Sequence, residues 1–166
     1  MMINFYFCIM KIMLLVIGKT DDGYLETGIM KYVGRLEHYV SFEMKVIPDL
    51  RNRKTLTVQE QKRQEGIMIL SQLSPGDEVI LLDEKGKTFT SRAFSQWVER
   101  LANANYKRVV FVIGGPYGFS DDVYDKAKHK ISLSEMTFSH QMVRLVFVEQ
   151  LYRAFTIIKG ESYHHD

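Results

Sequence analysis

Two stretches of the chain carry residues that could do chemistry: a glycine-rich loop and the C-terminal tail. The apolar run at residues 108–113 leads directly into Gly114, Gly115, Pro116, Tyr117 and Gly118. A strand that stops at glycines and a proline leaves backbone N–H and C=O groups open to a ligand. The tail ends in Tyr163, His164, His165 and Asp166. Tyrosine and histidine can donate, accept or move a proton near neutral pH, so loop and tail together predict an active site.

The composition is that of an ordinary globular protein. A chain of 166 residues is expected to form one domain that buries roughly 70% of its unfolded surface. Hydrophobic residues make up 46% of it and charged residues 25%, which excludes a disordered or a membrane chain. The single cysteine, Cys8, cannot form an internal disulfide, in keeping with a reducing, cytoplasmic location. The net charge of +2 permits an anionic partner without requiring one.

The first nine residues form an apolar run ahead of a second apolar run. They lack the basic start and the small-residue cleavage site of a secretory signal. Lys11 interrupts the segment and leaves it too short to span a bilayer. We therefore interpret residues 10–166 as one domain that starts at Met10 and residues 1–9 as an extension, with a strand or anchor as the alternative.

Strand and helix patterns alternate along the rest of the chain. Strands are expected at residues 11–17, 42–46, 78–82, 108–113 and 130–133. Helices are expected at residues 24–36, 57–73, 91–102 and 140–159, with a short one that Ser120 caps. The pair Thr57 and Glu60 has the spacing of a capping box, and Gly160 is placed to end the last helix. The order predicts an α/β fold, a mostly parallel sheet with helices on both faces.

Ligands of parallel sheets bind beyond the carboxyl ends of the strands. Two of the expected strands end in unusual residues, one at Leu82, Asp83 and Glu84 and the other at the glycine loop. We therefore expect the site at this edge of the sheet.

Several motifs, in order along the chain, resemble one family. They are residues 112–118, residues 133–138 followed by His140, Val143 with Arg144, residues 149–154, and residues 160–164. The chain resembles ribosomal RNA large subunit methyltransferase H over residues 10–164. That family belongs to the SPOUT superfamily, whose α/β fold ties its C-terminal segment into a trefoil knot.

The resemblance implies a cytoplasmic homodimer that acts on large-subunit (23S) rRNA within the ribosome. Its expected reaction is transfer of a methyl group from S-adenosylmethionine to N3 of a pseudouridine. Carried over by motif, the cofactor-binding residues are Leu82, Gly114, Leu133, Ser134, Glu135, Met136, Thr137 and Phe138. The implied partners are the ribosome and a second copy of the chain, with no membrane and no metal.

The acceptor nitrogen belongs to an imide, which attacks well only after it loses its proton. His164 is the candidate base, and Tyr163 is the candidate donor that orients the base or the nucleobase. Arg144, at the start of the last helix, is expected to support a phosphate or the developing negative charge.

Each feature taken alone also has a simpler interpretation. A glycine pair after a strand is commonly a tight turn, and a histidine tail is commonly solvated. The basic run Arg51, Arg53 and Lys54 could contact RNA phosphates or form a solvated loop. Adjacent His164, His165 and Asp166 do not have the spacing of a metal site.

Two other functions remain as alternatives. A non-catalytic RNA-binding module of the same fold would need no cofactor run at residues 133–138. A nucleotide hydrolase would hold phosphates on a glycine loop, but Gly18, Lys19 and Thr20 lack the earlier glycine that such a loop requires.

The last helix and the tail raise two further points. The helix is apolar over more than one stripe, which predicts either a partner subunit or a place between other elements of the same chain. Ser139 stands where relatives commonly have proline, and it can cap the helix instead. His165 stands where they have Lys or Arg, which should weaken a phosphate contact.

Overall fold

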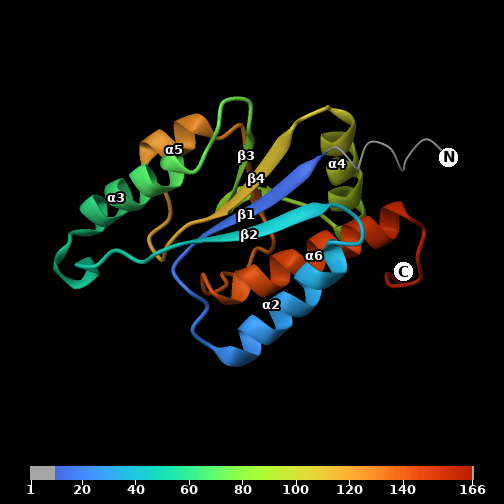
Figure 1. Cartoon of the computed structure of the whole chain (residues 1–166), viewed down its shortest axis with the longest axis horizontal. Coiled ribbons are helices and arrows are strands. Elements are labelled where there is room, and N and C mark those ends of the chain that lie inside the picture. The colour runs from blue at the N-terminus through green and yellow to red at the C-terminus, as the bar shows by residue number, and fades with distance from the viewer. Residues whose placement is uncertain (1–9, 166) are drawn as a thin grey trace.

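The computed structural model describes residues 10–165 of the chain. The expected extension at residues 1–9 and the last residue, Asp166, lie outside the described residues. A five-stranded sheet, parallel at every pairing, forms the centre of the molecule (Figure 1). Its strands are β1 (Lys11–Ile17), β2 (Ser41–Ile47), β3 (Glu78–Thr88), β4 (Arg108–Ile113) and β5 (His129–Ser132), arranged in the order β2-β1-β4-β3-β5.

Helices cover both faces of the sheet, as predicted. They are α2 (Gly23–Leu36), α3 (Val58–Ser71), α4 (Ser91–Asn103), α5 (Asp121–Lys126) and α6 (Met142–Ile158), with a 3-10 turn at Arg53–Thr55. Figure 1 shows α3 and α5 on one face and α2 and α6 on the other. The buried side chains form two clusters accordingly, one beneath α2, α4 and α6 and one beneath α3 and α5.

The burial of β1 shows why helices must cover both faces of the sheet. Every residue of β1 except Lys11 is buried. Ile12, Leu14 and Val16 point into the first cluster, whereas Met13, Leu15 and Ile17 point into the second. This confirms the strand buried on both faces. The strand β2 lies at the edge, as predicted, but its expected alternation holds only at Phe42 and Met44, since Val46 is exposed and Ile47 is buried.

The helix ends follow the expected chemistry with one exception. Thr57 caps α3 by accepting a hydrogen bond from the Glu60 N–H at 3.1 Å, and Ser139 accepts one from the Met142 N–H at 3.1 Å before α6. Gly160 ends α6 with φ +69°, and its N–H donates to the Ile157 carbonyl. The prediction for Ser120 is wrong: its hydroxyl is buried near Gly66 and makes no cap, so its carbonyl alone accepts bonds from the first turn of α5.

Two features of the fold extend beyond the expected elements. The strand β3 continues past residue 82 to Thr88, with an irregularity in its pairing to β5. The helix α6 packs between α2 and α4 as well as on the sheet, so much of its second apolar face is covered within the chain. The knot implied by the resemblance is consistent with this topology and stays a prediction. No helix of the described residues is long and apolar enough to cross a membrane.

Candidate active site at the carboxyl edge of the sheet

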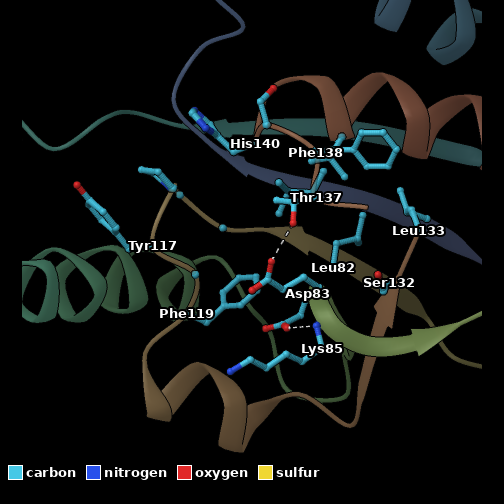
Figure 2. A pocket seen from close by; sticks show the side chains of 18 of the residues that line it. Leu82, Asp83, Lys85, Tyr117, Phe119, Ser132, Leu133, Thr137, Phe138 and His140 are labelled. Atoms are coloured by element: carbon cyan, nitrogen blue, oxygen red, sulfur yellow. Dashed lines mark hydrogen bonds between the residues drawn. The ribbon is translucent and has the colours of Figure 1, made fainter. Parts of the chain in front are cut away.

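A cavity of about 540 Å³ opens where β4 and β5 end, beside the irregular middle part of β3. Residues 82–85 of β3 and the loops that follow β4 and β5 supply most of its lining, which α3, α5 and α6 complete through Lys62, Tyr124 and Val143. Figure 2 shows Phe138, Thr137 and His140 on one side of the cavity and Asp83, Lys85 and Phe119 on the other. The site therefore lies at the edge of the sheet where parallel strands gather ligand-binding loops.

Two positions of the loop after β4 must be glycine because neighbouring atoms leave no room for a side chain. A Cβ atom on Gly114 would lie 3.0 Å from the ring of Phe119, and one on Gly115 would lie 2.6 Å from the Glu65 carboxylate. Gly118 adopts φ +80°, and its N–H donates to the Gly115 carbonyl at 3.2 Å. The loop thus presents its backbone to the cavity without side chains at the two glycines, as the sequence predicts.

The expected cofactor residues converge on this cavity, with Glu135 as the exception. Those that line it are Leu82, Gly114, Leu133, Ser134, Met136, Thr137 and Phe138. Glu135 is exposed and is not part of the lining. Local hydrogen bonds shape the loop, since Ser132 Oγ donates to the Ser134 carbonyl and the Met136 N–H donates to Ser134 Oγ.

Polar side chains form the opposite wall of the cavity. Asp83 accepts hydrogen bonds from the Lys85 N–H at 2.8 Å and from the Tyr124 hydroxyl. Burial and the neighbouring Asp83 carboxylate raise the pKa of Tyr124 well above its ordinary value, so the phenol stays protonated and donates. The sequence pointed to the residues after Leu82 but gave no signal for Tyr124 or Lys62, because both stand on helices distant in the sequence.

His140 lies at the mouth of the cavity beside α6. Burial, with smaller contributions from the Arg144 and Arg53 guanidinium groups, lowers the pKa of His140 below its ordinary value. Its imidazole is therefore neutral near pH 7 and can accept as well as donate a hydrogen bond. Sequence reasoning treated His140 only as the start of the last helix.

The tail does not reach the cavity of its own chain. Figure 1 shows the C-terminal end beside the last turns of α6. The Tyr163 hydroxyl donates to Glu149 Oε1 at 2.9 Å and lies 3.1 Å from the Tyr32 hydroxyl. His164 Nδ1 lies 3.3 Å from Arg153 Nη1, also on α6. Neither tail residue lines the cavity.

Arg144 has different surroundings from those expected of a phosphate ligand. Its side chain is fully buried. The guanidinium donates to the carbonyls of Ile17 at 2.5 Å, Gly18 at 2.9 Å and His140 at 3.2 Å. These bonds tie the first turn of α6 to the end of β1. The expectation that Arg144 meets a phosphate is therefore replaced by a positioning role, because its donors face backbone oxygens and not solvent.

No group of three or more histidine, cysteine, aspartate or glutamate side chains in residues 10–165 is arranged to hold a metal ion.

Comparisons with known proteins agree on one family. A sequence model of the family described as "Predicted SPOUT methyltransferase" matches residues 10–164. A ribosomal RNA large subunit methyltransferase H from Parabacteroides distasonis is 59% identical over 157 residues, which cover 95% of this chain and 100% of that protein. A protein of the same name from Flavobacterium psychrophilum is 58% identical over 94% of this chain and 99% of that protein.

One solved structure is similar in fold. It is a probable methyltransferase from Bordetella pertussis with a TM-score of 0.55 and 9% identity, and the match covers 92% of this chain and 98% of that one. At this identity the likeness concerns the fold alone. The family match and the high identity to the curated relatives are what identify the chain, which belongs to the SPOUT methyltransferase family and is a methyltransferase.

Proposed function

We propose that this protein transfers a methyl group from S-adenosylmethionine to N3 of a pseudouridine in large-subunit rRNA, within the ribosome in the cytoplasm. The observation that carries the proposal is the cavity at the sheet edge, to which Leu82, Gly114 and all residues of the loop 133–138 except Glu135 contribute together. The names of the relatives in Parabacteroides distasonis and Flavobacterium psychrophilum support the RNA substrate.

The residues of the cavity fit the cofactor. Its volume of about 540 Å³ lies within the usual range for small-molecule sites. Leu82, Leu133 and Phe138 offer an apolar slot for a planar base, and the open backbone beside Gly114 offers donors and acceptors for polar edges. When bound, S-adenosylmethionine supplies a methyl group on a positively charged sulfur.

The protein's task is then mainly orientation. The acceptor nitrogen, the methyl carbon and the sulfur must lie in line, which a rigid cavity achieves by positioning. The acceptor must also lose its imide proton, and we assign that step to His164 as base. The pKa of Tyr163 is raised by burial and by its hydrogen bonds to Tyr32 and Glu149. Tyr163 therefore remains a protonated donor that can orient the base or the nucleobase.

The tail must come from a second copy of the chain if it is to act at the cavity. Within one chain, Tyr163 and His164 pack against α6 and stay outside the lining. In a homodimer, the tail of each chain would approach the cavity of its partner and bring Tyr163 and His164 to it. The half-buried apolar residues that α6 retains, Val143, Leu145 and Val146, support such an interface.

The direct test combines a labelled cofactor with ribosomes from a strain that lacks the modification. We expect label at one pseudouridine of the large-subunit rRNA, mapped by nuclease digestion and mass spectrometry. Replacement of His164 by alanine should lower the single-turnover rate by about a hundredfold, a usual contribution of a general base. A wild-type rate in that variant would remove His164 from the mechanism.

A second measurement separates the enzyme from a non-catalytic RNA-binding module of the same fold. Calorimetry should detect binding of S-adenosylmethionine to the purified protein. A module without a working cofactor site would bind rRNA and give no heat with the cofactor.

A further inference from the structure

The wall that β3 contributes to the cavity contains a break in the strand. Leu82 and Lys87 both pair with Ile131 of β5, so residues 83–86 leave the ladder between them. A Cβ atom on Gly86 would lie 2.5 Å from the Ile131 carbonyl carbon, which means that only glycine fits where the strand rejoins. Close packing therefore fixes the far end of this segment, which we call the β3 bulge (residues 83–86).

Asp83 fixes the near end of the β3 bulge. One carboxylate oxygen accepts the Lys85 N–H at 2.8 Å, and the other accepts the Tyr124 hydroxyl in a short hydrogen bond. Tyr124 is itself held by an edge-to-face contact with Phe119, with ring centroids 5.7 Å apart. Charge-assisted hydrogen bonds of this kind are stronger than neutral ones. The pair Asp83 and Tyr124 thus anchors the β3 bulge to α5.

The β3 bulge faces the loop that carries most of the expected cofactor residues. Thr137 Oγ1 donates a hydrogen bond to Glu84 Oε2 at 3.4 Å, so the two walls meet at this point. Figure 2 shows Thr137 on one side of the cavity and Asp83 and Lys85 on the other. Displacement of the β3 bulge would break this contact and change the width of the space beside it, where a ligand must fit.

We propose that Asp83 and Tyr124 form a positioning pair that holds the β3 bulge in place and thereby sets the affinity of the cavity for the methyl donor. The inference rests on the proposed function, because it takes S-adenosylmethionine as the ligand. Neither side chain exchanges a proton or a methyl group in the reaction. The pair acts by removing the cost of ordering the wall when the ligand binds.

The test is a double-mutant cycle on cofactor binding, measured by calorimetry with S-adenosylmethionine. Tyr124→Phe removes only the hydroxyl, and Asp83→Asn removes the charge and replaces one of the two acceptor oxygens with a donor. Each variant should bind the cofactor about tenfold more weakly, and the double variant should bind no more weakly than the worse single one. Tyr106→Phe is the matched control, since Tyr106 is half-buried and lies outside the cavity lining.

Two further readouts separate positioning from general stability. A positioning role raises KM for the cofactor and leaves kcat at saturation near the wild-type value. A merely structural role would lower the melting temperature of the free protein and leave the Kd of the folded protein unchanged. The inference is overturned if the wild type binds the cofactor and both variants bind it equally well, or if their effects add. Absence of binding by the wild type would instead refute the proposed function, and this inference with it.

Discussion

Arg144 illustrates how a buried cation can serve a site without touching its ligand. Three backbone carbonyls, of Ile17, Gly18 and His140, accept its hydrogen bonds, and the Thr20 hydroxyl accepts a further one at 3.2 Å. Burial lowers the pKa of Arg144, but a guanidinium remains charged near neutral pH. The side chain thus joins the end of β1 to the turn from which His140 reaches the mouth of the cavity.

Arg144→Ala should destabilise the protein by about 3 kcal/mol, because it leaves buried carbonyls without donors. Arg144→Lys should recover part of this loss, since one ammonium cannot reach all three oxygens. Urea denaturation measures both. The matched control is Arg63→Ala, whose exposed pair with Glu60 should leave the midpoint nearly unchanged. If Arg144→Ala kept the wild-type midpoint yet abolished methylation, the arginine would act on the substrate after all.

Glu65 is a second buried charge, and it lies against the glycine loop. Its side chain is buried, Oε1 accepts from Gln61 Nε2 at 2.9 Å, and Oε2 has no hydrogen-bond partner. Burial raises the pKa of Glu65 above its ordinary value, and the nearby Asp49 adds to this. The folded state therefore binds this proton more tightly than the unfolded state does.

The sign of the resulting pH dependence follows from linkage. The contribution of Glu65 to stability is fully present below the unfolded pKa of about 4.3 and is lost as pH rises through the folded pKa. Glu65→Gln removes the titration and should gain stability relative to the wild type as pH rises from 4 to 8. Urea midpoints across that range measure it.

Glu60→Gln is the control of opposite sign. The hydrogen bonds from Arg63 and Gln64 lower the pKa of Glu60 to about 2, so its carboxylate stabilises the fold above its unfolded pKa. Because this pair is exposed, the variant should change stability only slightly, and the small change should be a loss relative to the wild type as pH rises. If the urea midpoints of Glu65→Gln and the wild type changed with pH in the same way, the explanation given for Glu65 would be wrong.

The residues of the cavity could be predicted to different degrees. Leu82 ends the strand that the sequence predicts, and Gly114 and Thr137 lie in the loops after β4 and β5, so their meeting at one edge of a parallel sheet could be expected. Glu135 shares the same loop, but its side chain turns outward, which no local pattern encodes. Tyr124 reaches the cavity only because α5 packs against the end of β3. Such contacts depend on tertiary packing rather than on periodicity.

The elements were predictable where one pattern dominated. The alternation of strands and helices predicted a sheet covered by helices on both faces. Thr57 begins a helix by accepting a side-chain hydrogen bond, and Gly160 ends one by adopting a positive φ. The predicted strand ended at Leu82, but β3 continues to Thr88 because Lys87 and Thr88 pair with β5. Ser120 has the residue type of a cap, but its hydroxyl is buried against Gly66. Long-range pairing and packing overrode local preference in both cases.

The end of α6 offers a test of how an element directs the tail. Gly160 adopts φ +69°, and the Glu161 N–H then donates to the Thr156 carbonyl at 2.9 Å. This turn brings Glu161 to the Tyr39 hydroxyl and Tyr163 to Glu149. A non-glycine residue in this left-handed region is strained.

Gly160→Ala should cost about 1 kcal/mol of stability, because the strain is local and nothing lies within 4 Å of the new Cβ atom. Gly76→Ala is closely matched, with φ +86° and equally open surroundings. We expect similar shifts in melting temperature for the two variants but a loss of ribosome methylation only for Gly160→Ala. Equal activities would show that the turn does not direct the tail.

At the scale of the whole molecule, the sequence patterns could not predict the order of the strands or which elements α6 packs against. Periodicity identifies strands but does not order them, and β2-β1-β4-β3-β5 depends on crossovers chosen by global packing. The second apolar face of α6 had two interpretations. The structure supports the place within the chain, because α6 packs against both α2 and α4.

Mixed dimers test whether the cavity of one chain works with the tail of another. One variant, Gly114→Val, forces a side chain against Phe119 in the cavity wall and so distorts the cavity but keeps its tail. The other, His164→Ala, keeps its cavity but loses the imidazole. Different affinity tags allow the mixed dimer to be purified, and circular dichroism controls for folding. If tail and cavity pair between chains, the mixed dimer contains one complete site and should show about half of the wild-type activity, although both parents are nearly inactive. If each tail served its own chain, or if the protein were a monomer, mixing would restore nothing, because no single chain carries both an open cavity and His164.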